Sequence, residues 1–281
     1  MNVKTVSVIG GGIMGSGIAH VSATAGFQTQ LYDISNDILV RSLTLITTNL
    51  QKGVELKKLT QEQMNSALSN LNVTEHLEQA ASADFIIEAV PEVIDLKVKL
   101  FAKLDKLAPK ESCFASNTSG LSITEMAAAT ERPQKFIGMH FFNPVHKMKL
   151  IEIIRGLETD SDTYATTDEV AKKMGKETVW VRESPGFVTS RMNALIGNEA
   201  FYMLQEGIAS AEDIDKALKL GLNHPMGPFE MVDLVGLDTR LSILQHLHET
   251  LGEKYRPCPL LTQYVKAGRL GRKTGKGVYE Y

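Results

Sequence analysis

The sequence predicts an α/β fold in which a doubly wound parallel sheet carries a long helical insertion and precedes an all-α domain. A β-branched segment, residues 3–9, runs directly into a glycine-rich turn and a helix. Further short apolar segments continue to about residue 182, where Ser184-Pro185-Gly186 interrupts the pattern. Beyond that point apolar residues recur only at helical spacing. We therefore expect two domains, residues 1–184 and 185–281.

The turn after the first strand has the spacing of a dinucleotide-binding loop. Gly10, Gly12 and Gly15 satisfy G-x-G-x-x-G between a strand and a helix. The first glycine permits the tight turn, the second lets the backbone approach a pyrophosphate, and the third lets the helix pack on the strand. The helix N-terminus favours negative charge there. The loop predicted to hold the cofactor in this Rossmann-type doubly wound sheet comprises Gly10, Gly11, Gly12, Ile13, Met14 and Gly15.

The second predicted strand, residues 28–32, ends at Asp33, 18 residues past Gly15. A carboxylate at this position accepts hydrogen bonds from both ribose hydroxyls of adenosine and repels a 2′-phosphate. The pattern therefore favours NAD over NADP. The alternative is a Rossmann-like module that binds another nucleotide.

Two later strands end in polar residues. DFIIEAVPE (84–92) and CFASNTSG (113–120) each read as a buried strand that leads into a loop. In doubly wound sheets such strand ends face the ligand crevice, so residues 116–119 are expected to border the nicotinamide. The same loop also fits a helix start, because Ser122 and Glu125 have capping-box spacing.

Residues 36–80 read as a long helical insertion that carries Lys52, Lys57 and Lys58. A lysine cluster on a helix is commonly a solvated face. It could instead meet the phosphates of a large anionic substrate such as coenzyme A.

The second half reads as helical. Residues 178–182 form one more strand, and helices are then expected from residue 187, after the cap at Ser210, and over residues 238–251. Residues 222–240 read as a Pro/Gly-rich link and the tail as basic and Gly-rich. A domain of so few amphipathic helices cannot bury all its apolar stripes well by itself. We therefore expect a homodimer through this domain.

The segment GMHFFNPVHKMKLIEIIRG (138–156) holds His140, His146 and Glu152. The two histidines lie on different local elements, without the spacing of a metal site, so no metal is expected. His140 falls near a strand end and Glu152 inside the next strand, among apolar residues. A buried carboxylate needs a partner, and an imidazole is a natural one. Such a pair fixes the tautomer of the histidine and lets its other nitrogen exchange a proton.

The bulk composition excludes several classes of function. With 43% hydrophobic and 22% charged residues and a net charge of −3, nothing indicates nucleic acid or an anionic membrane as a partner. No apolar run is long enough to span a bilayer, and strand-like sequence begins too early for a signal peptide. The two cysteines, Cys113 and Cys258, indicate no disulfide framework, so we expect a cytoplasmic protein.

These motifs together resemble the short-chain L-3-hydroxyacyl-CoA dehydrogenase family, and within it the bacterial 3-hydroxybutyryl-CoA dehydrogenase type. The resemblance covers nearly the whole chain. It rests on the motifs VIGGGIMGSGIAH, EAVPE, FASNTSGLSIT, GMHFFNPVHKMKLIEII, SPGFVTSR, HPMGPFEMVDLVGLDT and GRKTGKGVYEY.

The resemblance implies a role for each matching residue. His140 is the general acid/base at the 3-hydroxyl or 3-keto oxygen, Glu152 orients it, and Ser119 binds the substrate oxygen. Each remaining matching residue is implied to contact the cofactor NAD, the acyl-CoA thioester, or both. Cofactor contacts are implied for Glu92, Lys97, Asn117, Ser119, Asn143 and Lys273, and substrate contacts for Asn143, Ser190, Lys52 and Lys57.

The chain departs from the family pattern at two positions. Many relatives have asparagine directly before the arginine of the G-F-x-x-N-R segment, where this chain has Ser190. A serine can still donate one hydrogen bond, but its side chain is shorter than that of asparagine. Many relatives also have serine where this chain has Gly120. His146 stands where the motif tolerates variety and is expected to be non-catalytic.

Two other functions remain open on the sequence. The chain could oxidise a free hydroxyacid or a sugar acid, in which case the coenzyme A handle and the lysines would not matter. It could also be a non-enzymatic NAD-binding protein of the lens-crystallin kind, for which the substituted Ser190 is the one argument.

Overall fold

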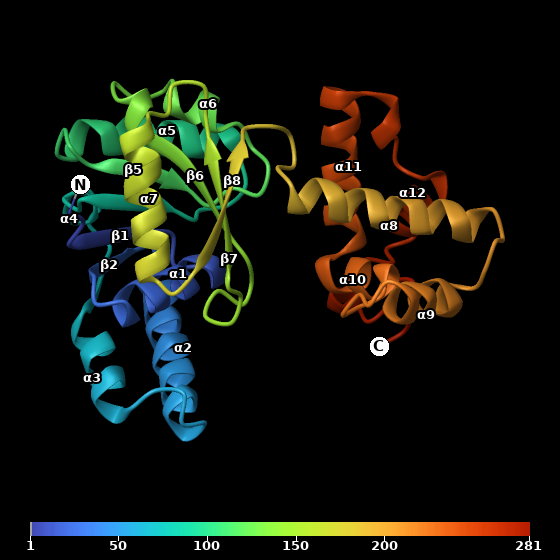
Figure 1. The fold of residues 1–281 in the computed structure, drawn as a ribbon, viewed down its shortest axis with the longest axis horizontal. Coiled ribbons are helices and arrows are strands. Elements are labelled where there is room, and N and C mark those ends of the chain that lie inside the picture. Colours follow the sequence, from blue (N-terminus) through green and yellow to red (C-terminus); the bar gives the residue numbers. More distant parts are fainter. Residues whose placement is uncertain (1) are drawn as a thin grey trace. The chain divides into compact units, whose positions relative to one another are not determined.

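The computed structural model describes residues 2–281. The chain forms two compact units, Met1–Ser184 and Pro185–Tyr281 (Figure 1). Within the described residues, no helix has the length and apolar character needed to cross a membrane.

The first unit is built on one eight-stranded sheet, in the order β3-β2-β1-β4-β5-β6-β7-β8. All neighbouring strands are parallel except β6 and β7. The strand order reverses between β1 and β4, so the sheet is doubly wound as predicted, and ligands of such sheets bind outside this point. The strands are β1 Thr5–Ile9, β2 Gln28–Tyr32, β3 Leu71–Thr74, β4 Phe85–Glu88, β5 Cys113–Ser116, β6 Phe136–Phe141, β7 Leu150–Arg155 and β8 Glu177–Arg182.

Helices cover both faces of this sheet because successive strand side chains point to opposite faces. Ala115 faces the core that α1 and α7 complete, whereas Phe114 packs with Phe101 of α5 and with Phe136 on the other face. The helices are α1 Ile13–Thr24, α2 Asn36–Glu55, α3 Gln61–Ser69, α4 Leu77–Ala80, α5 Ile94–Leu107, α6 Ile123–Ala127 and α7 Ser161–Lys173.

The insertion after β2 forms a helical hairpin, α2 and α3, that extends beyond the sheet (Figure 1). The expectation of helix throughout residues 36–80 is wrong at Leu71–Thr74, which form β3. Among residues 2–281 this strand pairs only with β2, and Asn72 and Val73 are exposed. It therefore lacks the continuous apolar run by which a buried strand is detected.

The second unit is all-α and has its own core. It contains α8 Thr189–Gln205, α9 Ala211–Gly221, α10 Pro228–Val235, α11 Leu237–Leu251 and α12 Pro259–Lys266. Phe201 of α8 packs edge-on against Phe229 of α10 and Tyr264 of α12. Two of these helices correct the sequence expectation, because α10 lies in the segment read as a link and α12 in a stretch where no helix was expected.

The C-terminal tail is fastened to α10 by one buried carboxylate. Asp233, 1% exposed, accepts hydrogen bonds from the backbone N–H groups of Val278 (2.8 Å) and Tyr279 (2.9 Å). It also accepts one from the hydroxyl of Tyr281 (3.0 Å). The chain passes so close that a Cβ on Gly277 would lie 2.0 Å from the Asp233 carboxylate.

Candidate active site

The glycine loop after β1 has the shape that a pyrophosphate needs. A Cβ on Gly10 (φ +108°) would lie 2.7 Å from the carbonyl oxygen of Ala89, and one on Gly15 would lie 1.7 Å from that of Gly10. These two glycines therefore allow the tight turn and the close packing of α1. A Cβ on Gly12, by contrast, would meet nothing within 4 Å. The open side of the loop is thus at Gly12, where a ligand can approach the backbone.

The N-terminus of α1 leaves its N–H groups available at the same place. Gly12 is the N-cap and provides no side-chain cap, and the first turn contains no acidic residue. Unpaired N–H groups and the helix dipole both favour an anion. The loop and helix together fit a dinucleotide phosphate.

Asp33 stands at the end of β2 as predicted. Its carboxylate is half-buried and accepts hydrogen bonds from the backbone N–H groups of Gly11 (2.7 Å) and Ser35 (3.1 Å). These bonds hold the negative charge directly beside the glycine loop.

A buried ion pair lies under the neighbouring strand ends, and the sequence reasoning did not identify it. The Lys97 ammonium lies 2.5 Å from Glu88 and 3.3 Å from Glu92, and the Ser116 hydroxyl donates to Glu88 (2.6 Å). Burial raises the pKa of Glu88, an effect opposed by the adjacent Lys97 ammonium. Lys97 is 1% exposed, so its charge acts mainly through the two glutamates. The sequence feature that indicates this pair is Glu88, an acidic residue at the end of the otherwise apolar segment FIIE.

Glu92 connects this pair to the predicted nicotinamide loop. Its carboxylate accepts hydrogen bonds from the Thr118 hydroxyl (2.5 Å) and the Ser119 N–H (2.8 Å). The Ser119 side chain is exposed, and its hydroxyl bonds to none of residues 2–281. Asn117 accepts a hydrogen bond from the N–H of Phe141 (2.9 Å), which joins the ends of β5 and β6.

His140 and Glu152 face each other across β6 and β7. They are directly paired in the antiparallel register, and His140 Nδ1 lies 2.7 Å from a Glu152 carboxylate oxygen. Glu152 is fully buried and His140 is 6% exposed. The expected contact between the two side chains is therefore present. Among residues 2–281, no group of three His, Cys, Asp or Glu side chains could hold a metal ion.

Comparison with known proteins identifies the family. The model for the NAD binding domain of 3-hydroxyacyl-CoA dehydrogenase matches residues 5–184, and the model for the C-terminal domain matches residues 186–281. The chain belongs to the 3-hydroxyacyl-CoA dehydrogenase family. It is thus related to enzymes that use NAD.

Similar proteins share the whole length of the chain. A 3-hydroxybutyryl-CoA dehydrogenase of Bradyrhizobium diazoefficiens is 48% identical over 99% of this chain and 96% of its own. A probable 3-hydroxybutyryl-CoA dehydrogenase of Bacillus subtilis is 47% identical over 100% and 98%. The crystal structure of an (S)-3-hydroxybutyryl-CoA dehydrogenase from Ralstonia eutropha matches with a TM-score of 0.97 at 42% identity, over 100% and 99% of the two chains.

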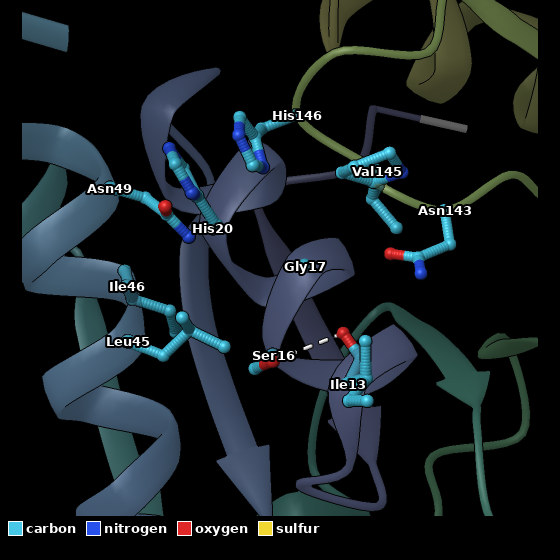
Figure 2. Close-up of a pocket in the computed structure, with 11 residues that line it drawn as sticks. Ile13, Ser16, Gly17, His20, Leu45, Ile46, Asn49, Asn143, Val145 and His146 are labelled. Carbon is cyan, nitrogen blue, oxygen red and sulfur yellow. Dashed lines mark hydrogen bonds between the residues drawn. The ribbon is translucent and has the colours of Figure 1, made fainter. Parts of the chain in front are cut away.

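A cavity of about 220 Å³ opens beside α1 in this dehydrogenase fold (Figure 2). Asn143 lies on one side of it, whereas the stacked rings of His20 and His146 lie with Asn49 on the other. The ring centroids of the two histidines are 5.4 Å apart. Burial, together with His146 and Lys176, lowers the pKa of His20 to about 4. His146 thus contacts a buried histidine, and Glu152 contacts His140.

The remaining expected site residues lie in other places. Lys52 is exposed in the last turn of α2, and Lys57 follows that helix with φ 55°. Ser190 lies in the first turn of α8 in the second unit. Lys273 belongs to the same unit, where its ammonium pairs with Asp238 at 2.6 Å.

Proposed function

We propose that this chain interconverts (S)-3-hydroxyacyl-CoA and 3-ketoacyl-CoA with NAD as the cofactor, acting on 3-hydroxybutyryl-CoA and acetoacetyl-CoA. Family membership supports the dehydrogenase reaction, and the names of the relatives support a four-carbon acyl group. The observation that carries the proposal is the buried pair of His140 and Glu152 at 2.7 Å.

The proposed role of His140 is to move one proton. In the oxidation, it removes the proton of the 3-hydroxyl group while the hydrogen on C3 leaves as hydride. NAD, when bound, supplies the hydride acceptor. Because Glu152 lies against Nδ1, that nitrogen keeps its hydrogen and Nε2 exchanges the proton. The carboxylate also stabilises the imidazolium that forms. In the reduction, the same imidazolium returns the proton to the keto oxygen.

The proposed binding roles follow the strand ends. The loop from Gly10 to Gly15 and Asp33 hold the adenosine diphosphate half of NAD, supported by the open space at Gly12. Glu92 and Asn117 position the nicotinamide end, with Lys97 acting through Glu92. Ser119 offers its hydroxyl to the substrate oxygen. Asn143, which lines the cavity beside α1, contacts the substrate and the cofactor.

Two residues of the second unit also belong to the proposal. Ser190 takes the place of the family asparagine toward the substrate, and Lys273 contacts the cofactor. In the structure the ammonium of Lys273 forms an ion pair with the carboxylate of Asp238. The proposal includes a homodimer formed by the second unit and a cytoplasmic location.

One steady-state assay tests the reaction and its main alternative. Acetoacetyl-CoA and free acetoacetate are compared with NADH, together with a C4 to C10 panel of 3-hydroxyacyl-CoAs with NAD. We expect turnover of the thioesters, with the highest kcat/KM at C4. Equal turnover of the free acid would instead favour a hydroxyacid dehydrogenase, and NAD binding without turnover of any substrate would favour a non-enzymatic role.

A further inference from the structure

The ion pair of Glu88 and Lys97 lies where three segments of the first unit meet. Glu88 ends β4, Ser116 ends the adjacent β5, and Lys97 lies near the start of α5. Both charged side chains are buried, since Glu88 is 0% and Lys97 is 1% exposed. Neither can therefore contact a ligand directly, and an effect on a ligand has to pass through an exposed neighbour.

The Glu88 carboxylate is surrounded by hydrogen-bond donors. Oε1 accepts from the Lys97 ammonium (2.5 Å) and from the N–H of Val90 (2.7 Å), and Oε2 accepts from the Ser116 hydroxyl (2.6 Å). The backbone carbonyl of Glu88 also accepts from the N–H of Asn117 (2.8 Å). Burial raises the pKa of Glu88, whereas these side-chain contacts oppose that effect because they favour the ionised carboxylate. Glu88 thus fixes the ends of both strands and holds the ammonium.

Lys97 divides its charge unequally between two glutamates. Its ammonium lies 2.5 Å from Glu88 but 3.3 Å from Glu92. Glu92 is the exposed member, with 45% of its side chain accessible, and it bonds to the Thr118 hydroxyl and the Ser119 N–H. Two carboxylates and one ammonium leave one net negative charge. Because Glu88 holds the ammonium more closely, this charge is presented at Glu92.

The nicotinamide ring changes its charge in the reaction. The ring of oxidised NAD is cationic, whereas the ring of NADH is neutral. A carboxylate beside the ring therefore attracts the oxidised form more strongly than the reduced form. The charge presented at Glu92 thus enters the difference in affinity between the two forms of the cofactor.

We propose that Glu88 is a positioning residue that holds Lys97 away from Glu92, so that the charge of Glu92 favours oxidised NAD relative to NADH. The inference rests on the proposed function, which has Glu92 at the nicotinamide end. Without the charge of Glu88, the ammonium would have Glu92 as its one carboxylate partner among these groups. The pair of Lys97 and Glu92 would then be neutral.

The test measures the dissociation constants of both cofactor forms, NADH by fluorescence titration and NAD by calorimetry. For Glu88→Gln we expect the ratio of Kd for NAD to Kd for NADH to rise about three- to tenfold, or about 0.7–1.4 kcal/mol. Adding Lys97→Met to Glu88→Gln restores one net negative charge. The double variant should return the ratio to within about twofold of the wild-type value. A merely structural role of Glu88 would weaken both cofactor forms alike, without this rescue.

Two further variants separate charge from structure. Glu92→Gln removes the exposed charge itself and should raise the ratio at least as much as Glu88→Gln does. Asp105→Asn is the matched control, because Asp105 also lies on α5, where its carboxylate pairs with Arg132 at 2.6 Å near the other end of the helix. We expect Asp105→Asn to leave the ratio unchanged.

An unchanged ratio in Glu88→Gln or Glu92→Gln, or a double variant without rescue, would overturn the inference. Thermal unfolding checks that Glu88→Gln folds. Should it unfold, Lys97→Met carries the test, since loss of the ammonium leaves Glu92 uncompensated and should lower the ratio; a ratio that does not fall would overturn the inference. Wild-type protein that binds both cofactor forms but turns over no 3-hydroxyacyl-CoA would instead refute the proposed function.

Discussion

Asp33 is the residue through which we expect the chain to choose between NADH and NADPH. Its carboxylate is fixed beside the glycine loop by two backbone N–H groups, so it cannot readily turn away from a 2′-phosphate. We predict that kcat/KM for NADH exceeds that for NADPH by about 100-fold, or about 2.7 kcal/mol.

Asp33→Ala should narrow this preference, chiefly by improving the reaction with NADPH. Equal kcat/KM for the two cofactors in the wild-type protein would rule out this role of Asp33. Thermal unfolding of the variant provides the control for loss of structure.

His20 should make stability depend on pH below neutrality. Its pKa is about 4 in the folded protein and near 6.5 in an unfolded chain. Between these values the unfolded state binds more protons, so the free energy of unfolding falls as pH falls from 6.5 to 4. The loss approaches about 3 kcal/mol below pH 4.

Urea unfolding at several pH values measures this dependence. His20→Phe cannot be protonated, so its stability should fall less steeply between pH 6.5 and 4. Identical slopes for the two proteins would show that His20 is not the titrating group. The neighbouring His146 and Lys176 remain in both proteins, which isolates the effect of His20.

Some contacts between single residues could be predicted from the sequence, and others could not. The contact between His140 and Glu152 was predictable because consecutive strands pair, and because a buried carboxylate requires a partner. The contact between Glu88 and Lys97 was not predicted, since it depends on where α5 packs. The stacking of His20 on His146 depends on the path of the link after β6, which no periodicity indicates.

At the scale of elements, one carboxylate holds the C-terminal tail to α10. Replacing Asp233 with alanine would leave the N–H groups of Val278 and Tyr279 without their acceptor. We predict a loss of about 2–4 kcal/mol in the free energy of unfolding, because buried donors would become unsatisfied. In this variant, hydrogen exchange at the amides of Val278 and Tyr279 should become faster than in the wild-type protein, before any increase is seen at the amides of α8.

Asp233→Asn serves as the conservative comparison, since an amide oxygen can still accept one of these bonds. It should cost less than the alanine variant. Unchanged amide exchange in Asp233→Ala would contradict the anchoring role.

The elements that could not be predicted from the sequence have two different physical causes. The helices α10 and α12 each begin with proline. Proline is typical of a link, but it is also compatible with the first helical turn, which needs no N–H from that residue. The strand β3 is short and its two central residues, Asn72 and Val73, are exposed, so it has no apolar run. The buried strands β1, β4, β5 and β6 were predicted correctly because most of their residues are apolar and nearly all are buried.

At the scale of the whole molecule, the doubly wound sheet and the helical second unit both followed from the order of patterns along the chain. The exposed apolar side chains of the second unit could not be predicted from periodicity. They include Met192, Ile208, Leu220, Leu222 and Leu234, which are between 49% and 77% exposed. A homodimer formed by the second unit would cover apolar side chains of this kind.

We predict that the protein is a dimer at micromolar concentration. Analytical ultracentrifugation should give twice the chain mass of 30.9 kDa. Replacing Leu220 and Leu222 with glutamate should weaken association by at least about tenfold, because two charges would have to be desolvated. A wild-type monomer at that concentration would contradict the prediction.

The whole account depends on proton transfer by His140. The most direct measurement is the steady-state reduction of acetoacetyl-CoA by NADH, with the wild-type protein and with His140→Gln. We predict that the variant binds NADH normally, by fluorescence titration, but loses about 10²- to 10⁴-fold in kcat. Near-normal kcat in His140→Gln would contradict the account.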